Sequence, residues 1–524
     1  MCTPVNRRVR LRDFADRPIS LPDGPEAWEP WPRPTPGDGK DAEDILLLGL
    51  GPGRPESLSF TKDKNVFWLE EPRILRLLNV ARPPGDIPDH WRQVSIRRAL
   101  ELVPQCRVHI YRLNGRLAPL FWGPVMGSIA AGRVNPGQAG AMHATRRNAE
   151  KEGRGMVLLP GTAARLLHQE LASAFRNAGF TVAEMPLWNE RPRPFAVWET
   201  AVASRPALVL SVNLRGLDPD GEIFWLCRAL RVPVAIWCVD NPWHLLSALP
   251  LPWWKEATLF VTDASFIPAL REAGAGKAHY LPLAVAPHMW RGLAREQPLQ
   301  PVFAGHSAFP DRERFFAAAH PPEETLEHAA QGALPGCPDS PAAGPHFHWW
   351  MDKLKLCPWP GQAARRAGFG ADTCSRLRRA RWIAAALAAG LRLIGDDGWR
   401  ALLPGIPVLP PVDYYTALPD CYARSAVLNV TSLLLPHSLS QRHFDVWAAG
   451  GLLLTDATPG LEIFPAELTR PVVLEKPEDF APRLALLRAN SVAVFRLREQ
   501  WREALREGHC YEHRVARICG TLGL

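Results

Sequence analysis

Residues 426–456 read AVLNVTSLLLPHSLSQRHFDVWAAGGLLLTD, and this stretch decides the fold of the C-terminal third of the chain. Its two apolar runs, AVLNVTS at 426–432 and GLLLTD at 451–456, have the length and composition of buried parallel strands. Residues 441–449 between them have helical spacing and are followed by two glycines. Strand, helix and strand in this order predict one unit of a parallel α/β sheet.

The first turn of that helix carries candidate ligand-binding groups. Unsatisfied backbone N–H groups and the positive end of the helix dipole at this position favour a diphosphate. Arg442 can pair with a phosphate, and Asp445 can accept hydrogen bonds from ribose hydroxyls. Gly450 and Gly451 allow the helix and the next strand to pack tightly. The residues alone equally allow a capped helix with an exposed polar end.

The same alternation of strands and helices extends upstream. Apolar runs at 155–161, 207–213, 232–240 and 257–263 predict one α/β unit, and runs at 301–307 and 391–399 open the next. Ligands of open parallel sheets bind beyond the carboxyl ends of the strands. The sequence therefore predicts two Rossmann-like halves that face a cleft and are joined near residues 287–301. The last fifty residues read as mainly helical and residues 320–370 as irregular.

A further unit precedes these halves. Residues 1–43 read as an irregular lead-in, and DILLLGLGPG at 44–53 is an apolar run that ends in glycines. The next strand ends in Glu70 and Glu71, whose distance from the glycine turn fits a ribose-binding carboxylate. Residues 129–155 read as a linker. The predicted domains are 1–150, a Rossmann-like accessory domain, then 155–290 and 300–524 as the two halves.

Composition excludes several classes of protein. Hydrophobic residues make up 47% and charged residues 22% of the 524 residues, which is a globular balance. The net charge is +8, but the basic residues are dispersed, so no nucleic-acid partner is expected. The densest group, Arg376, Arg378, Arg379 and Arg381, is expected to form a solvated helix face.

Compartment and metal content are also predicted from residue usage. The ten cysteines form no Cys-x-x-Cys pair, which speaks against a zinc site or disulfide framework and fits a reducing compartment. Residues 1–12 lack an apolar core, and no segment has eighteen uninterrupted apolar residues, so we expect a cytoplasmic chain without an integral membrane segment. Asp218-Pro219-Asp220 reads as a turn, and His346 and His348 read as core packing, so no metal site is expected.

The quoted stretch closely resembles the donor-domain signature of the CgeB-like (spore-maturation-protein-like) glycosyltransferases, bacterial relatives of the GT-B superfamily. The resemblance covers about residues 155–480 and includes VNLRGLDPDG from 212, VPVAIWCVDNPWHLL from 232, VFAGHS from 302 and LIGDDGW from 393. It implies a GT-B type fold and transfer of a sugar from a nucleoside-diphosphate sugar to a protein or surface-glycan acceptor. It also implies a metal-independent reaction with no cofactor besides the nucleotide-sugar donor.

The resemblance also implies which residues bind the donor. Arg442, His443 and Asp445 match the position where related enzymes recognise ribose and diphosphate, although many of those enzymes carry Glu in place of Asp445. The complete set of expected donor-binding residues is Gly305, Ser307, Asp396, Trp399, Asn429, Arg442, His443, Asp445, Gly450 and Gly451.

The acceptor half has its own candidates. Asp240 and Asn241 end the run VPVAIWCVDN, where a carboxylate could reach an acceptor hydroxyl as catalytic base, and His244 is the second choice. Asp240 equally fits a helix cap or a turn before Pro242.

Two other functions remain open from the sequence. One is a methyltransferase that binds S-adenosylmethionine at residues 49–53 and at Glu70 and Glu71. The other is a non-catalytic sugar-nucleotide-binding protein that has the same fold without turnover.

Overall fold

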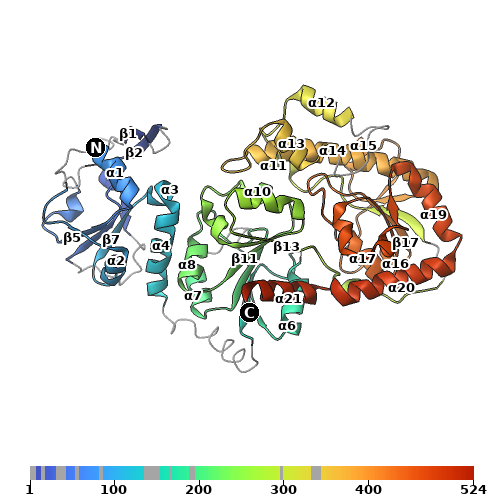
Figure 1. The fold of residues 1–524 in the computed structure, drawn as a ribbon, viewed down its shortest axis with the longest axis horizontal. Helices are drawn as coiled ribbons and strands as arrows, with labels where there is room; N and C mark the ends of the chain where they lie inside the picture. Colours follow the sequence, from blue (N-terminus) through green and yellow to red (C-terminus); the bar gives the residue numbers. More distant parts are fainter. Residues whose placement is uncertain are drawn as a thin grey trace.

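The computed structural model describes residues 8–12, 18–30, 43–53, 58–81, 87–134, 154–165, 167–187, 195–295, 299–331 and 344–524. Three α/β units follow one another along its long axis (Figure 1). Each unit is built around its own sheet, and parallel pairing predominates.

The N-terminal unit has a five-stranded sheet in the order β3-β7-β4-β5-β6, in which only β3 runs antiparallel to its neighbour among the described strands. Its elements are β1 Arg8–Arg12, β2 Pro18–Pro22, β3 Trp28–Pro30, β4 Ile45–Leu48, β5 Val66–Leu69, α1 Pro72–Ala81, β6 Arg92–Gln93, α2 Ile96–Leu102, β7 Arg107–Tyr111, α3 Asn114–Leu117 and α4 Pro119–Arg133.

Two sequence predictions for this unit are wrong where the chain is described. Residues 1–43 are not wholly irregular, because β1 and β2 form a hairpin and β3 joins the sheet beside β7. The indole of Trp28 is buried and donates to the Gly49 carbonyl, which fixes β3 against the glycine turn. The predicted linker 129–155 begins as the last turn of α4, and its residues 135–153 lie outside the described part.

The middle unit has six parallel strands in the order β13-β12-β11-β10-β8-β9. Strands β8, β10, β11 and β12 are buried along their whole length, as expected for strands covered on both faces. The elements are β8 Met156–Pro160, α6 His168–Asn177, β9 Thr181–Met185, α7 Phe195–Ala203, β10 Leu208–Val212, α8 Glu222–Ala229, β11 Val234–Cys238, α9 Pro242–Leu246, β12 Thr258–Val261, α10 Ile267–Glu272 and β13 Lys277–Tyr280.

The C-terminal unit has six parallel strands in the order β16-β15-β14-β17-β18-β19. Its sheet strands are β14 Gln300–Ala304, β15 Arg392–Ile394, β16 Val408–Leu409, β17 Ser425–Asn429, β18 Leu452–Asp456 and β19 Val473–Leu474. Its helices are α11 Arg312–Phe315, α12 Glu323–Gln331, α13 Phe347–Lys353, α14 Ala363–Ala386, α15 Trp399–Leu402, α16 Leu418–Ala423, α17 Arg442–Ala449, α18 Ala466–Thr469, α19 Phe480–Arg488, α20 Ser491–Gly508 and α21 Tyr511–Leu522.

The strand order confirms the predicted α/β fold class, with two Rossmann-like lobes after an N-terminal Rossmann-like domain. The C-terminal lobe has the doubly wound order in which the chain leaves its first strand, β14, toward one edge and returns to β17 on its other side. Ligands of such sheets bind at the carboxyl ends of the two strands where the order reverses. The fold therefore points to the crevice between β14 and β17.

The two lobes share helices, which the predicted boundary at residue 300 does not anticipate. Ala367 and Cys374, in the first half of α14, belong to the core of the middle unit, whereas Trp382 in its second half belongs to the C-terminal core. The last helix, α21, returns to the middle unit and packs on α6. Residues 320–370, predicted to be irregular, contain α12, α13 and the start of α14.

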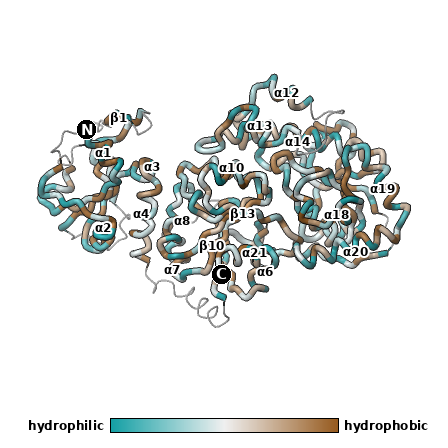
Figure 2. Tube along the Cα trace, in the orientation of Figure 1, coloured by the Kyte–Doolittle hydropathy of each residue, from teal (hydrophilic) through white to brown (hydrophobic). Residues whose placement is uncertain are grey.

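Hydrophobic segments run through the sheets, and the outlying helix α12 is hydrophilic (Figure 2). Within the described ranges, no helix combines the length and apolarity needed to cross a bilayer.

Replacement of Gly451 by alanine tests the tight packing predicted for the glycine pair. A Cβ at Gly451 would collide with the carbonyl oxygen of Tyr422, so we expect Gly451→Ala to lower the free energy of unfolding by about 1–3 kcal/mol. The midpoint of urea unfolding, followed by tryptophan fluorescence, measures this loss. Gly508→Ala is the control, because no atom lies within contact distance of a Cβ there. Equal midpoints for both variants would contradict the packing role.

Candidate functional site

A pocket of about 410 Å³ lies at the carboxyl ends of β14 and β15, beside the start of α17. The loops after β14 and β15, residues 411–422 and the first turn of α17 line it. It borders the point where the strand order reverses, and its lining contains Arg442 and Asp445, the two residues central to the predicted donor site.

Arg442 spans the reversal point. Its Nε and Nη2 donate to the Ala304 carbonyl at 2.9 and 2.7 Å, and Nη1 donates to Asn429 Oδ1 at 3.2 Å. The guanidinium lies over the Phe303 ring, 5.2 Å from its centroid. A Cβ at position 305 would collide with Nη2 of Arg442, so this close approach requires a glycine. At least three of the five guanidinium N–H groups are thus bound by the protein, and the Tyr422 side chain also interacts with Arg442.

Asp445 is 1% exposed and bonds to its own lobe and to the connection between the lobes. Its Oδ1 accepts from the Ala286 N–H at 3.1 Å and from Gln441 Nε2 at 2.9 Å, and Oδ2 accepts from the Tyr414 hydroxyl at 2.9 Å. Burial raises the pKa of Asp445 to about 7, and these hydrogen bonds oppose that rise. Ala286 lies in the connection between the lobes, so the first turn of α17 holds that connection.

His443 and Asn429 lie behind the pocket wall and are buried. Burial lowers the pKa of His443 to about 4, so its ring is neutral and its Nδ1 accepts from the Ser440 N–H at 3.0 Å. Asn429 Oδ1 accepts from Ser440 Oγ at 2.8 Å. Both residues fix the turn that starts α17, and neither is among the residues that line the pocket, where the sequence predicted a direct donor contact.

Gly450 and Gly451 are at the opposite end of α17 from the pocket. Gly450 ends the helix with a φ of 87°, a conformation that favours glycine, and Gly451 packs against the Tyr422 carbonyl. Both glycines were expected to contact the donor, but the eight-residue helix α17 separates them from the pocket. Their role is in packing.

Two residues that follow β15 hold the loop after β14 in place. Trp399 Nε1 donates to the Gly305 carbonyl at 2.8 Å, and Asp396 Oδ2 accepts from the Ser307 N–H at 3.0 Å. Burial would raise the pKa of Asp396, but hydrogen bonds from Ser307 and His306 lower it overall. Ser307 and Trp399 are buried, so they support the loop, whereas Gly305 and His306 line the pocket.

The arginines predicted to form a solvated face of α14 instead support this loop and the sheet edge. Arg379 donates to the His306 and Ser307 carbonyls, each at 3.0 Å, and Arg376 donates to the Ser307 carbonyl at 3.2 Å. Arg378 forms a buried ion pair of 2.8 Å with Asp456. Helical spacing placed these arginines on α14 but gave no sign of the loop carbonyls that Arg376 and Arg379 meet.

The three candidates of the acceptor half have different surroundings in the structure. Asp240 follows β11 and is exposed to solvent, and its Oδ2 accepts from Asn213 Nδ2 at 2.7 Å. Protein atoms around the carboxylate desolvate it and raise its pKa, which the hydrogen bond from Asn213 partly offsets. Asn213 and Leu214 have φ angles of 54° and 62°, a strained conformation that occurs preferentially at functional sites.

Asn241 and His244 have structural partners. Asn241 Oδ1 caps α9 by accepting from the Trp243 N–H at 3.0 Å, so Asp240 is not the cap. Asn241 Nδ2 donates to the Leu434 carbonyl of the other lobe at 3.0 Å. His244 lies among three phenylalanine rings with its Nε2 buried against α14, and burial lowers its pKa to about 3. Of the three candidates, only Asp240 is exposed to solvent.

The carboxyl ends of the two parallel sheets face each other. Asn241, after β11, bonds to Leu434, and Asp263, after β12, accepts from the His437 N–H at 2.9 Å. Leu434 and His437 belong to the loop after β17, which leads into α17 and the pocket. Asp240 therefore lies at the sheet edge that meets the pocket-bearing lobe.

Side chains of the N-terminal unit bind the backbone of the glycine turn after β4 and fill the space beside it. Glu70 is buried and accepts from the Leu50 and Glu71 N–H groups, each at 2.9 Å, and Glu71 accepts from the Ile74 N–H at 2.8 Å to start α1. The Asn114 amide fills the space where a Cβ of Gly49 would point. These carboxylates hold backbone, which removes the basis for the predicted S-adenosylmethionine contact.

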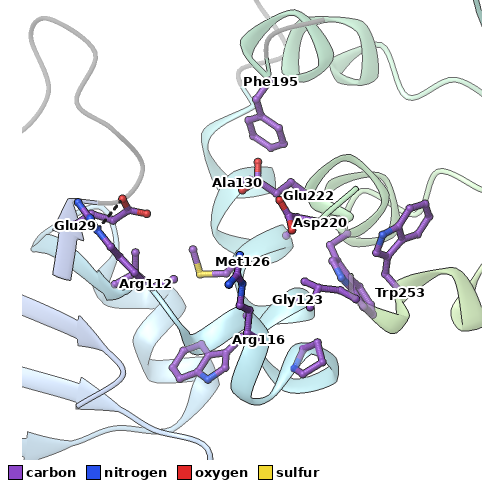
Figure 3. A pocket seen from close by; sticks show the side chains of 17 residues that line it. Glu29, Arg112, Arg116, Gly123, Met126, Ala130, Phe195, Asp220, Glu222 and Trp253 are labelled. Atoms are coloured by element: carbon purple, nitrogen blue, oxygen red, sulfur yellow. Dashed lines mark ion pairs between the residues drawn. The ribbon is translucent and has the colours of Figure 1, made fainter. Parts of the chain in front are cut away.

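A second pocket of about 260 Å³ lies between α4 of the N-terminal unit and the middle unit (Figure 3). Gly123 and Gly127 bring α4 against Trp225 of α8, where any Cβ would collide. Asp220 and Glu222 lie on the middle-unit side of the pocket, and Asp218 caps α8 by accepting from two of its N–H groups at 2.8 Å. The segment from Asp218 to Asp220 is therefore a turn, as predicted.

The paired histidines also have structural partners. His346 starts α13 by accepting from the Trp349 N–H, and His348 Nε2 lies 2.8 Å from Ser265 Oγ. In the part of the chain that the structure describes, no three His, Cys, Asp or Glu side chains are grouped to hold a metal ion.

A family model matches part of the sequence. Residues 377–520 match the model of a family described as glycosyl transferase-like. The matched segment contains β17, α17 and most of the pocket lining. No curated protein matches the chain.

Two solved structures resemble the fold more distantly. One is the DNA-modifying enzyme β-glucosyltransferase, determined with and without uridine diphosphoglucose, with 9% identity and a TM-score of 0.39 over 70% of this chain and 99% of that one. The other is T4 phage BGT with its UDP-glucose substrate, with 8% identity and the same TM-score and coverage. These likenesses are too weak to argue from, and the fold class follows from the strand order.

Removal of the Asp445 charge tests its buried state. The folded pKa of about 7 lies above the ordinary value of 3.8, so this carboxyl makes the folded state less stable as pH rises from about 4 to 7. We expect Asp445→Asn to lose less stability than the wild type over this range, measured as urea midpoints at each pH. Asp397→Asn, which changes an exposed carboxylate of the same lobe, should follow the wild type. A constant difference between Asp445→Asn and the wild type would contradict the buried proton.

Proposed function

We propose that the chain is a GT-B glycosyltransferase that moves a sugar from a nucleoside-diphosphate sugar to an acceptor. The observation that carries the proposal is the pocket beside the β14 and β17 reversal point, where Arg442 and the start of α17 meet the loop after β14. The glycosyl transferase-like match covers this same helix and strand.

The donor diphosphate would lie between the first turn of α17 and the loop that contains Gly305. The positive end of the α17 dipole and the charge of Arg442 supply positive potential there, and it stabilises the charge that develops on the departing diphosphate. Gly305 lets the phosphates approach the backbone. The sugar and base would occupy the rest of the 410 Å³ between residues 394–395 and residues 411–422.

Asp240 would act as the catalytic base from the other lobe. In the step proposed, the acceptor oxygen bonds to the anomeric carbon, the carbon–oxygen bond to the diphosphate breaks with its electron pair on the diphosphate, and Asp240 takes the acceptor proton. A raised pKa brings a carboxylate closer to the range in which a base works at neutral pH. Asn213 holds the carboxylate in place.

Resemblance to the CgeB-like enzymes in sequence supports the finer parts of the proposal, which are membership of that bacterial family, a protein or surface-glycan acceptor, a metal-independent reaction and no cofactor besides the donor. A cytoplasmic location is supported by the cysteine pattern, which fits a reducing compartment. None of these alters the chemistry assigned to Arg442 and Asp240.

Ligand-induced thermal stabilisation tests donor binding. A panel of UDP, GDP, ADP, the corresponding sugar nucleotides and S-adenosylmethionine should raise the melting temperature only with members of one nucleoside-diphosphate series. Arg442→Ala should weaken that binding about tenfold or more, because a charge-assisted contact is lost. Arg400→Ala, an exposed arginine of the same lobe, is the control. A response to S-adenosylmethionine alone would overturn the transferase proposal.

The role of Asp240 is tested by turnover. Asp240→Asn should lower kcat about 10²- to 10⁴-fold for transfer from the selected donor to cell-extract acceptors, with little change in donor Kd, because only proton removal is lost. Glu272→Gln, which changes another exposed carboxylate of the same lobe, should retain wild-type kcat. Full activity of Asp240→Asn would exclude Asp240 as base. Donor binding by the wild type without any transfer or donor hydrolysis would favour the non-catalytic binding protein.

A further inference from the structure

The pocket between the N-terminal unit and the middle unit is a second space that a small ligand can enter (Figure 3). The end of β7, α3 and α4 form one wall, and the starts of α7 and α8 with residues 251 and 253 form the other. Its volume of about 260 Å³ is that of about nine water molecules, at roughly 30 Å³ each. No described residue lines both this pocket and the one beside Arg442.

Most of the lining is apolar. Large side chains of both units contribute to it, namely Trp122, Met126, Phe195, Trp225, Leu251 and Trp253. The indole of Trp225 is 5% exposed, and its N–H has no hydrogen-bond partner among the described residues. It lies against Gly123, which belongs to the same lining. Since buried indole N–H groups usually have a partner, this one is available to an acceptor oxygen of a ligand.

The charged side chains of the lining are divided between the two walls. Glu29, Arg112 and Arg116 belong to the N-terminal unit, and Asp220 and Glu222 belong to the middle unit. Glu29 pairs with Arg112 at 3.5 Å, so Arg116 supplies the net positive charge of the first wall. Arg116 and Asp220 are exposed, and neither forms an ion pair with another described residue. One wall is therefore basic and the other acidic.

We propose that this pocket binds a zwitterion with a large apolar side chain, either an amino acid or a dipeptide. The ligand carboxylate pairs with Arg116, and the ligand ammonium group pairs with Asp220 and Glu222. The apolar side chain packs on Met126 and the indoles, and a ligand oxygen accepts from the Trp225 N–H. A ligand with one charge alone would meet a like charge on one of the walls, which disfavours it.

Occupation of the pocket also acts on the contact between the two units. Helix α4 meets α8 where Gly123 and Gly127 approach Trp225. A ligand that bonds to both walls adds to this contact, so it favours the state in which the N-terminal unit rests on the middle unit. The inference goes beyond the proposed function and uses none of its residues.

The experiment measures binding to the full chain by titration calorimetry at pH 7.0, where α-amino and α-carboxyl groups are both charged. The probes are phenylalanine, leucine, phenylalanylglycine and glycylphenylalanine, each beside its N-acetyl form and its amide. At least one zwitterion should bind, and each of its blocked forms should bind about tenfold more weakly, because one charge-assisted contact is lost. The two kinds of zwitterion show whether the pocket takes an amino acid or a dipeptide.

Variants assign the charges to the two walls. Arg116→Gln should weaken binding of the zwitterion about tenfold and leave the affinity of its amide unchanged, because the amide has no carboxylate to pair. Asp220→Asn should weaken the zwitterion and leave the N-acetyl form unchanged, because that form has no ammonium group. Arg97→Gln and Glu272→Gln, which change exposed residues of the two units outside the pocket, should bind as the wild type.

Three outcomes would overturn the inference. The first is that no zwitterion of the panel binds the wild type. The second is equal affinity for a zwitterion and both of its blocked forms. The third is an equal loss of zwitterion and amide affinity in Arg116→Gln, which would show a structural effect. None of these results involves donor binding or sugar transfer, so failure here leaves the proposed function as it stands.

Discussion

The C-terminal lobe depends on the hydrogen bonds of one guanidinium, that of Arg442, to the Ala304 carbonyl and the Asn429 side chain. In a doubly wound sheet the connections leave the reversal point in opposite directions, so no helix covers the ends of the two central strands. The strand-end carbonyl there needs a donor, and a planar guanidinium supplies two N–H groups to it. The same geometry leaves the crevice open for a ligand.

The pocket and the lobe connection share residues. Asp445 lines the pocket and accepts from Ala286, and Gln441 beside it donates to the Ala284 carbonyl at 2.7 Å. Both partners lie in the chain that links the lobes. A ligand that displaced either side chain would therefore act directly on the chain between the lobes.

The sheets could be predicted from the sequence more completely than the directions in which the side chains point. Strands such as β4 and β11 are continuous apolar runs because both faces are buried, and this signal needs no tertiary knowledge. Strand β3 was missed because it has three residues and is held by the Trp28 indole, a contact across 21 positions. His443 and Asn429 belong to the right motif but face the core, since a motif places residues at a strand end without fixing which of them reach solvent.

The arginines of α14 show why the positive charge beside the pocket could not be predicted from the sequence pattern alone. Charged residues are rarely buried, so an arginine-rich helix reads as solvated. Here Arg376 and Arg379 satisfy carbonyls of the loop after β14, and Arg378 pairs with Asp456 at the end of β18. Arginine fits these positions because its rigid fork bonds carbonyls while keeping its charge. The positive potential beside the pocket thus comes from side chains that the fold already requires, so it is present before an anion binds.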